Sequence, residues 1–470
     1  MTELARKLGL ADSLFLVIGS VFGSGIFLTT GIIASGLPSP GLIWLVWIIG
    51  GIITTIGALT YAELGTLYPG SGGPYVYLKE AYGSSVSFLY GWTFFWIIGG
   101  GGIAALAIGF AEYFGSLVPA LSFGHKLSAF NLGPIHLSLS AGHVTAILSI
   151  MILSGINYFG IQGGARFQNL MTGLRIAALL AFAVLGLMIG KKPGFQNLVP
   201  FFPRGRIPSW TYFGAALLAV IWTYDGWYSV SCTAEEIRNP RKTIPRSLVL
   251  GTAAVAALYL LANIVYSMAL PVNEMDGVLR IGELAAVRLF GPGIARLFSA
   301  VVAIAVLGCL SANILYSPRV SFAMARDGLF FKNLSFVHPR FRVPTKAILA
   351  QMIWSSLLCL SGTYQSLIEY VAFALVLFFA ATGFSVLVLR RKVPDRERPF
   401  RAWGYPVLPI LYVVFNLVIF IAVIFSRPVH ALAGEASSWP DCPPISFGRR
   451  EKIVSPRMEA GYEPRSEDPA

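Results

Sequence analysis

Apolar runs close to the length of a membrane-crossing helix recur along the chain, separated by short polar or basic segments. A helix needs about 20 apolar residues to cross the hydrocarbon core of a bilayer. The pattern therefore predicts an all-α integral membrane protein with eleven spans. The predicted spans are 11–34, 41–66, 86–118, 141–161, 167–190, 209–237, 247–270, 292–323, 345–361, 364–390 and 404–426.

The composition supports a polytopic membrane protein. Hydrophobic residues make up 56% of the chain and charged residues only 12%, whereas a soluble domain carries about a quarter charged residues. The opening segment, MTELARKLGLADS, is polar and charged and leads directly into the first span. That pattern differs from a cleavable signal peptide, which has its own apolar region and a cleavage site.

The net charge of +13 is unevenly distributed. Lys and Arg gather in the segments 238–246, 319–346 and 390–401, which fall on one side of the membrane if residues 1–10 are cytoplasmic. This bias follows the positive-inside rule. We therefore expect a plasma (inner) membrane protein with a cytoplasmic N-terminus, whose basic residues set topology and contact anionic lipid. No nucleic-acid partner is expected.

The residues that most often carry catalysis or bind metals are scattered. Cys232, Cys309, Cys359 and Cys442 form neither a disulfide framework nor a metal site, and the five histidines fall in loops or near span ends. We expect no metal and no cofactor. Without a nucleophile–base pair or a metal cluster in the spans, the pattern also disfavours an intramembrane enzyme.

Two spans carry interruptions. The first contains GSVFGSGIFLTTG (19–31), with glycine at 23 and 25, although glycine costs about 1 kcal/mol in a helix interior relative to alanine. The sixth contains AVIWTYDGWYSV (219–230), with Asp225-Gly226 at its middle. Corresponding interruptions in two halves of a chain indicate an inverted-repeat transporter with its binding site near the midplane.

This symmetry predicts the organisation of the chain. A cytoplasmic N-terminus (1–10) precedes a first inverted repeat of five spans (11–190), and a second repeat of five spans follows (209–390). Residues 404–426 form an accessory eleventh span.

The interruptions also predict what binds there. A helix broken inside a bilayer must line a cavity or contact a ligand, since lipid cannot satisfy the freed backbone groups. The amides at 23–25 form the positive end of a helix dipole, which suits a carboxylate. The carbonyls near Val21 and at 221–224 suit an ammonium group. A site that binds both groups is an amino-acid site.

Several longer motifs resemble one family. GSGIFLTTG, then YAELGTLYPGSGGPYVYLKEAYG (61–83) and WTYDGWYSVSCTAEEIRNPRKTIPRSL (222–248), are similar to the amino acid–polyamine–organocation transporters, in the bacterial form of their L-type branch. The resemblance runs from about residue 8 to 433. It implies a LeuT-like fold of two five-span inverted repeats with broken first and sixth helices. It also implies sodium-independent exchange or facilitated transport of neutral L-amino acids.

The resemblance assigns roles to individual residues. Ser24 and Gly25 would bind the substrate carboxylate, and the Val21 carbonyl would bind the ammonium group. Trp222 stands where the family places an aromatic gate, with packing or lipid contact as its alternative. The complete expected substrate site is Val21, Gly23, Ser24, Gly25, Trp222, Thr223, Tyr224 and Asp225. The run GGGG (99–102) either packs against a broken helix or lines the pocket.

Two charged residues depart from the family pattern. Asp225 either caps the amides that start the inner half of span six or favours cationic substrates and the ammonium group. Arg175 stands in span five where relatives tend to have lysine, and arginine keeps its charge when buried. We expect Arg175 to tether span five to the first half-helix, near Gly19, and to argue against sodium coupling. Its alternative is to snorkel to the cytoplasmic edge.

The end of the chain lacks the family's twelfth span. Residues 435–470 are rich in Pro, Ser and charge and cannot span a bilayer. A shifted reading frame permits an apolar run ending in basic residues from Gly434 onward. The hypothesis is therefore that this hydrophilic tail arose by a frameshift, and the DNA sequence of the gene tests it.

The expected partners are an amino-acid substrate and the lipid bilayer. Some eukaryotic L-type members attach to a heavy chain through a cysteine between spans three and four. Residues 119–140 contain no cysteine, so no disulfide-linked heavy chain is expected. A proton-coupled amino-acid symporter is the alternative function, and an amino-acid sensor without transport is a further one.

Overall fold

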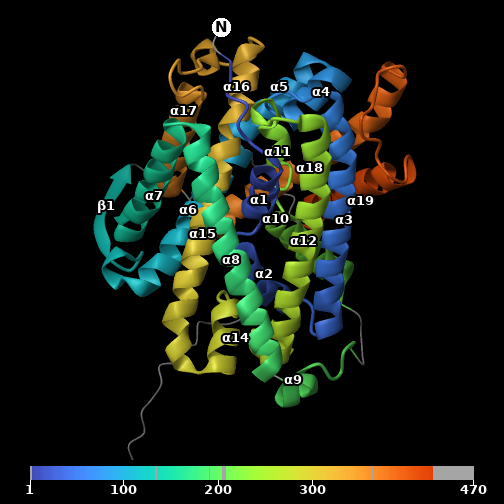
Figure 1. Ribbon diagram of the computed structural model, residues 1–470. Helices are drawn as coiled ribbons and strands as arrows, with labels where there is room; N and C mark the ends of the chain where they lie inside the picture. Colours follow the sequence, from blue (N-terminus) through green and yellow to red (C-terminus); the bar gives the residue numbers. More distant parts are fainter. Residues whose placement is uncertain (1–2, 133–134, 190, 204–207, 362–363, 427–470) are drawn as a thin grey trace, which may run out of the picture.

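The computed structural model describes residues 3–132, 135–189, 191–203, 208–361 and 364–426 (Figure 1). The tail at 435–470, with its frameshift hypothesis, lies outside these residues. Within them, eight helices are long and apolar enough to cross a membrane, and three shorter apolar helices accompany them. Each predicted span overlaps one of these eleven segments, so the all-α membrane architecture is confirmed.

The elements follow one another along the chain with few gaps. In the first half they are α1 (Leu10–Val21), α2 (Gly25–Ala34), α3 (Pro40–Leu67), α4 (Pro74–Tyr82), α5 (Ser84–Thr93), the π-helix η1 (Phe94–Gly99), α6 (Gly100–Leu117), η2 (Pro119–Leu121), α7 (Ala141–Tyr158) and α8 (Ile161–Ile189). In the second half they are α9 (Lys191–Asn197), α10 (Trp210–Thr223), α11 (Ser229–Cys232), η3 (Ala234–Glu236), α12 (Pro240–Ala269), α13 (Val272–Met275), α14 (Ile281–Phe290), η4 (Pro292–Ile294), α15 (Ala295–Tyr316), α16 (Pro318–Arg326), η5 (Lys332–Ser335), α17 (Thr345–Ser361), α18 (Tyr364–Lys392) and α19 (Val407–Ser426).

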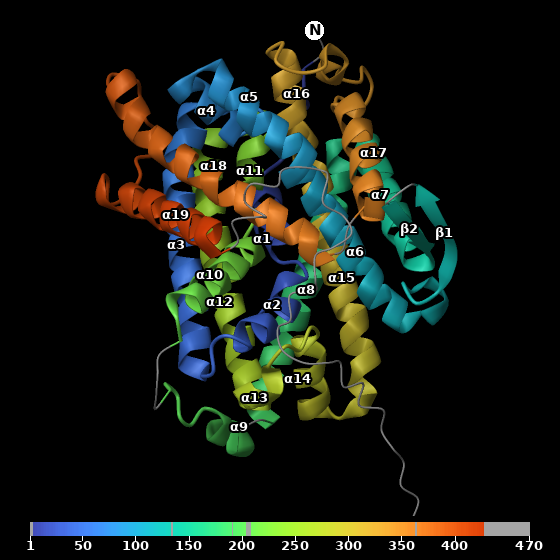
Figure 2. The ribbon, with the colours of Figure 1, turned by 180° about the vertical axis from the view of Figure 1, so that it is seen from behind.

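One small sheet interrupts the helical pattern. The strands β1 (Lys126–Leu132) and β2 (Ile135–Ser140) form an antiparallel hairpin between α6 and α7. The hairpin lies outside the membrane-crossing helices, at the side of the molecule (Figures 1 and 2). Strands this short lack the long apolar runs that predict membrane-crossing helices, and the sequence pattern predicted none.

Both predicted breaks are present. The first span is broken between α1 and α2 at residues 22–24, and the sixth is broken between α10 and α11 at 224–228. Gly226 has φ of +96°, a backbone conformation that favours glycine. A Cβ atom there would also lie 2.7 Å from the carbonyl oxygen of Ser20. The two breaks therefore touch each other, and only glycine allows that approach.

The broken spans lie at the centre of the helix bundle. In the two opposite views, α1 and α10 are surrounded by the long helices α3, α6, α8, α12, α15 and α18 (Figures 1 and 2). The helix α3 packs along α12, while α15 packs along α6 and α8. Surrounding helices thereby shield from lipid the backbone groups freed at the two breaks, as such breaks require.

The helix α8 begins earlier than predicted. It starts at Ile161, not at 167, because Gly160, with φ of +132°, ends the preceding segment and turns the chain directly into α8. Arg175 therefore lies at the middle of a 29-residue helix, and its side chain is 1% exposed. The alternative in which Arg175 snorkels to a membrane edge is wrong.

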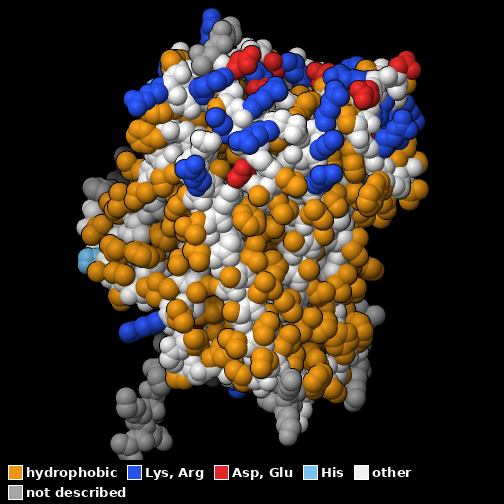
Figure 3. Space-filling model, viewed as in Figure 1, with side chains coloured by type: hydrophobic (Ala, Val, Ile, Leu, Met, Phe, Trp, Pro, Cys, Tyr) orange, Lys and Arg blue, Asp and Glu red, His pale blue; other side chains and the backbone are white. Residues whose placement is uncertain are grey.

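The end of the molecule where the N-terminus lies carries most of the Lys and Arg visible in Figure 3. A buried ion pair holds this end together, because Arg319 donates to both carboxylate oxygens of Glu236 at 2.9 and 3.0 Å. The Glu236 carbonyl in turn accepts the amides of Lys7 and Leu8, each at 2.9 Å. The N-terminal segment, the loop after the sixth span and α16 are thereby joined.

A second contact at the same end joins α4 to α16. Lys79 pairs with Asp327 at 2.8 Å, and the hydroxyl of Tyr75 donates to the same carboxylate at 2.8 Å. Burial raises the pKa of Tyr75, and the hydrogen bond to Asp327 raises it further. The phenol therefore stays protonated and remains a donor at neutral pH.

Candidate functional site

A cavity of about 30 Å³ lies where the two breaks face each other. That volume accommodates a water molecule but is too small for an amino acid, so the surrounding residues must move apart to admit one. The lining residues are Ser20, Val21, Gly23, Ser24, Gly25, Gly102, Leu106, Trp222, Thr223, Asp225, Cys309 and Asn313. The structure thus brings together seven of the eight predicted site residues, with Tyr224 as the exception.

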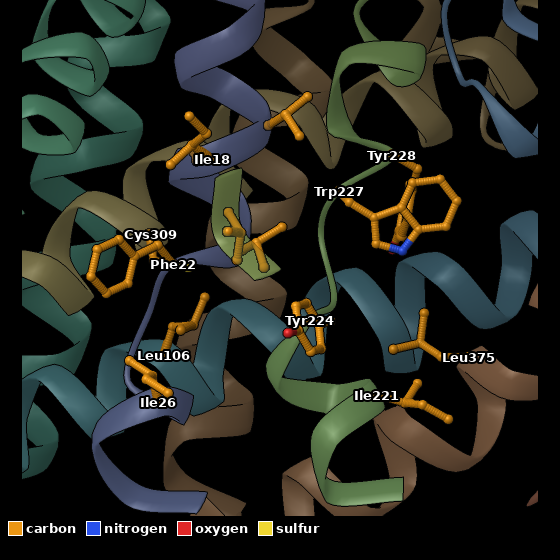
Figure 4. Close-up of a cluster of buried hydrophobic side chains, with 14 of the residues drawn as sticks. Ile18, Phe22, Ile26, Leu106, Ile221, Tyr224, Trp227, Tyr228, Cys309 and Leu375 are labelled. Carbon is orange, nitrogen blue, oxygen red and sulfur yellow. The ribbon is translucent and has the colours of Figure 1, made fainter. Parts of the chain in front are cut away.

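Figure 4 shows the surroundings of the breaks. Phe22, Leu106 and Cys309 lie on the side of the first broken span, while Tyr224, Trp227 and Tyr228 follow the course of the sixth. Tyr224 packs away from the cavity against Trp47, at a ring distance of 5.9 Å.

The Val21 carbonyl is already occupied. It accepts the Gly23 amide at 2.8 Å and the hydroxyl of Tyr259, on α12, at 2.9 Å. The same hydroxyl lies 3.3 Å from the Thr223 carbonyl. A carbonyl oxygen has two lone pairs, and Val21 uses both of them in this closed state. Tyr259 thereby connects the end of α1 to the end of α10.

Arg175 binds the next carbonyl along the chain. Its Nη1 donates to Phe22 at 2.5 Å and to Ala305, on α15, at 2.9 Å, and its Nη2 donates to the Thr172 hydroxyl at 2.8 Å. The guanidinium therefore lies between the break in the first span and α15. The carbonyl it reaches is that of Phe22, three residues beyond the expected Gly19.

Two further side chains join the broken spans. Cys309, on α15, donates its thiol hydrogen to the Ser20 carbonyl at 3.1 Å. The Ser20 hydroxyl donates to the Gly226 carbonyl at 2.8 Å and lies 2.9 Å from the Ser229 hydroxyl. Three consecutive carbonyls at the end of α1 are thus bound by side chains from α8, α12 and α15.

The opposite end of the break presents amides. The first amides of α2 have no carbonyl partner inside their own helix, and Ser24 is the N-cap residue of that helix. Gly25 lies close against α10, because a Cβ at this position would be 2.6 Å from the Thr223 methyl group. Thr223 also bonds Thr29 through their hydroxyls at 2.9 Å. The backbone at Gly25 is thereby held at the cavity.

Asp225 does not cap the inner half of span six. The helix α11 begins at Ser229, which is four residues beyond Asp225. Its N-cap residue is Tyr228. Among the residues that the structure describes, Oδ1 of Asp225 is buried and has no hydrogen-bond partner. Asp225 is one of the residues that line the cavity, as is the half-buried Trp222.

The glycine run of span three fulfils one of its two predicted roles, because it lines the cavity but packs against α17, which is not a broken helix. Gly102 lines the cavity, and a Cβ atom there would meet nothing within 4 Å. Gly100 instead lies against Trp354, whose Cδ1 would be 2.6 Å from an added Cβ. One glycine of the run therefore borders open space, and another permits close helix packing.

Five residues of the site were not predicted. Ser20, Leu106, Cys309 and Asn313 line the cavity, and Tyr259 binds the Val21 carbonyl. Leu106 and Cys309 lie in apolar runs with nothing local to distinguish them. Asn313 and Tyr259 carry polar groups inside predicted spans, a signal that could have marked them as functional candidates.

A bundle with two broken helices meeting at a cavity, and with amides and carbonyls facing it, is the architecture of a secondary transporter. The chain belongs to the amino acid permease family, whose model matches residues 8–439. It is therefore a transporter of amino acids and not an enzyme, and its resemblance to the amino acid–polyamine–organocation superfamily is confirmed.

Known relatives cover nearly the whole chain. The serine/threonine exchanger SteT of Bacillus subtilis is 34% identical over 415 residues, which is 87% of this chain and 89% of the relative. The human b(0,+)-type amino acid transporter 1 is 27% identical, covering 91% of this chain and 84% of the relative. The mouse large neutral amino acids transporter small subunit 2 is 29% identical, covering 91% and 78%.

Proposed function

We propose that the protein exchanges neutral L-amino acids across the plasma membrane by alternating access, without sodium. The observation that carries this proposal is the pair of facing breaks, with helix amides on one side of the cavity and carbonyls on the other. Free amino acids carry one carboxylate and one ammonium group, which match these two sides. A cavity too small for its substrate must open and close around it.

The first break provides the substrate contacts. The amides at Gly23, Ser24 and Gly25 bind the carboxylate, with α2 contributing the positive end of its dipole. The Val21 carbonyl binds the ammonium group, which takes the place of the Gly23 amide. The sixth span contributes the backbone of residues 222–225, and Trp222 closes over the substrate as a gate.

Arg175 supports the independence from sodium. Its guanidinium keeps a full positive charge beside the Phe22 and Ala305 carbonyls, at 2.5 and 2.9 Å. Carbonyl oxygens of this kind would otherwise suit a small cation. A fixed arginine repels sodium and releases no proton, so neither ion is coupled at this position.

The cavity favours small neutral substrates with a hydroxyl group. Asp225 and Asn313 contribute two polar side chains to the lining. A serine or threonine hydroxyl would satisfy the carboxylate at small volume. The similarity to a serine/threonine exchanger supports this substrate class.

Topology and organisation follow from the same proposal. The basic end of the molecule, where the N-terminus lies, is cytoplasmic according to the positive-inside rule. Residues 11–190 and 209–390 are the two inverted repeats, and 404–426 is an accessory span. The protein needs only its substrate and the bilayer as partners.

Uptake into liposomes tests the proposal. Purified protein is reconstituted into vesicles with or without internal unlabelled serine, and uptake of labelled serine is measured with and without sodium and proton gradients. We expect uptake that requires internal amino acid and ignores both gradients. Uptake into empty vesicles that rises with a proton gradient would instead establish the proton-coupled symporter.

A further inference from the structure

A second and larger cavity lies on the outside of the helix bundle. It is about 400 Å³ in volume and forms a groove between α3 and α12, named here the α3–α12 groove. Its lining residues are Trp47, Ile48, Gly51, Ile52, Thr55, Ile56, Ala253, Ala256, Ala257 and Leu260. Neither the substrate site nor the predicted accessory elements account for it.

The groove exists because its floor is built from small residues. Gly51 carries no side chain, and an added Cβ there would lie 2.9 Å from Cβ of Ala256. Ala253 and Ala257 are exposed and too short to fill the space. The axes of α3 and α12 can therefore approach closely, while a groove remains on the outer surface between them. At 1.5 Å per residue, the wall from Trp47 to Ile56 is about 14 Å long.

The chemistry and position of the groove indicate a hydrocarbon occupant. It lies in the central parts of two membrane-crossing helices, and the surface over α3 and α12 away from the basic end is largely hydrophobic (Figure 3). Its rim includes Ile48 and Ile52, which are 40% and 54% exposed. The single hydroxyl of the lining, on Thr55, is satisfied by the Gly51 carbonyl at 2.8 Å.

The groove is therefore continuous with the hydrocarbon core of the bilayer, which is about 30 Å thick. Water gains nothing in an apolar void of this kind, and lipid chains are the solvent at that depth. The length of the groove and its mostly apolar lining suit one acyl chain better than a polar group.

The inner wall of the groove leads directly to the substrate site. Trp47 packs against Tyr224 and Tyr259, with ring distances of 5.9 and 5.5 Å, and the Tyr224 hydroxyl donates to the Trp47 carbonyl at 3.4 Å. Gly51 also borders Tyr224, since an added Cβ would be 3.0 Å from that hydroxyl oxygen. Tyr224 is the first residue of the break in span six.

We propose that an acyl chain of a membrane phospholipid occupies the α3–α12 groove and supports Tyr224 from the lipid side. Because Tyr259 binds the Val21 carbonyl on the far side of the same aromatic cluster, occupancy of the groove is coupled to the break where substrate binds. The coupling rests on the proposed transport function, whereas the lipid site does not.

The site is tested by photo-cross-linking. The full chain is reconstituted in vesicles containing a phosphatidylglycerol with a diazirine at the middle of one acyl chain, and adducts are mapped by mass spectrometry after irradiation. We expect adducts concentrated on residues 47–56 and 253–260. The double variant Ala253→Leu/Ala257→Leu fills the groove and should lose them. Ala177→Leu, an exposed position on α8 outside the groove, should retain them.

Two results would overturn the lipid site. Adducts spread evenly over lipid-facing helices, or unaffected by the double variant, would show an ordinary lipid boundary. Disulfide-linked dimers of an Ala257→Cys variant in the membrane would show that a second copy covers the groove.

Transport in the same vesicles tests the coupling separately. We expect the double variant to exchange serine at a rate different from wild type, and Ala177→Leu to match wild type. Equal rates in all three proteins would overturn the coupling and leave the lipid site standing. Absence of amino-acid transport by wild type would refute the proposed function, while the cross-links would still decide the lipid site.

Discussion

Three glycines of the cavity lining have different surroundings, and these decide what each one does. An added Cβ would lie 2.6 Å from the Thr223 methyl group at Gly25, and 2.8 Å from the Cys309 sulfur at Gly23. At Gly102 it would meet nothing within 4 Å. The first two glycines permit contact between elements, whereas the third preserves open space for a ligand.

Replacement of Gly25 by alanine should abolish uptake. The added methyl group forces α2 away from α10 and displaces the amides that face the cavity. Overpacking of this kind costs about 1–3 kcal/mol, so the melting temperature should also fall. Gly173→Ala is the control, because this glycine in α8 has open space at its Cβ. A Gly25→Ala protein with normal uptake would show that the contact is dispensable.

Gly102→Ala should alter selectivity without unfolding the protein. Its methyl group enters the cavity and clashes with no protein atom, while alanine favours the helix by about 1 kcal/mol. We expect KM to rise more for threonine than for serine, with the melting temperature unchanged or higher. Competition between the two labelled substrates in liposomes measures this effect, and an unchanged ratio would place the substrate elsewhere.

At the scale of elements, the break in the first span is held by its neighbours. Arg175 from α8, Tyr259 from α12 and Cys309 from α15 each bind one carbonyl at the end of α1. A buried carbonyl left without a partner costs about 1–3 kcal/mol. These three helices therefore stabilise the closed arrangement and must release or follow α1 when the site opens.

Comparison of the variants Tyr259→Phe and Tyr266→Phe isolates the contribution of the Tyr259 hydroxyl. Both tyrosines are fully buried on α12, but only the Tyr259 hydroxyl binds the broken spans. The Tyr266 hydroxyl has no hydrogen-bond partner among the described residues. Tyr259→Phe should lower the free energy of unfolding by about 0.5–1.5 kcal/mol, the net contribution of one hydrogen bond, because the Val21 carbonyl keeps the Gly23 amide. It should also reduce exchange, whereas Tyr266→Phe should do neither. Equal behaviour of the two variants would contradict the role of Tyr259.

At the scale of the whole molecule, an ion pair holds the basic end together, whereas side-chain packing holds the middle of the bundle together. The Glu236–Arg319 pair is almost completely buried, with side chains 0% and 1% exposed. It links the loop after the sixth span to α16, and the N-terminal segment binds the same glutamate through its backbone. These contacts hold three segments of the basic end together.

Glu236→Gln should therefore destabilise the closed end. Removal of one partner from a buried ion pair leaves an uncompensated charge and costs about 3–5 kcal/mol. Glu397→Gln breaks the exposed pair with Arg241, whose side chains are 64% and 78% exposed, and exposed pairs contribute about 0–1 kcal/mol. Thermal melting in detergent compares the two variants. A similar small shift in both would mean that the buried pair is not structural.

Much of this organisation was predictable because it depends on local properties of the chain. The spans follow from the length of apolar runs, and the two breaks follow from Gly23, Gly25 and Asp225-Gly226. Arg175 was predicted to tether span five to the first half-helix, but its burial depends on the packing of α8 against α1 and α15. The predicted cap by Asp225 was wrong because α11 begins only at Ser229.

Neighbouring residues in the chain are enough to predict that this protein crosses the membrane, where its spans break and which end of the molecule is basic. The packing of the helices places Cys309, Asn313 and Tyr259 at the site, limits the cavity to about 30 Å³ and leaves a groove between α3 and α12. These features depend on contacts between residues far apart in the chain, and apolar helices carry little local information about which of their faces will meet.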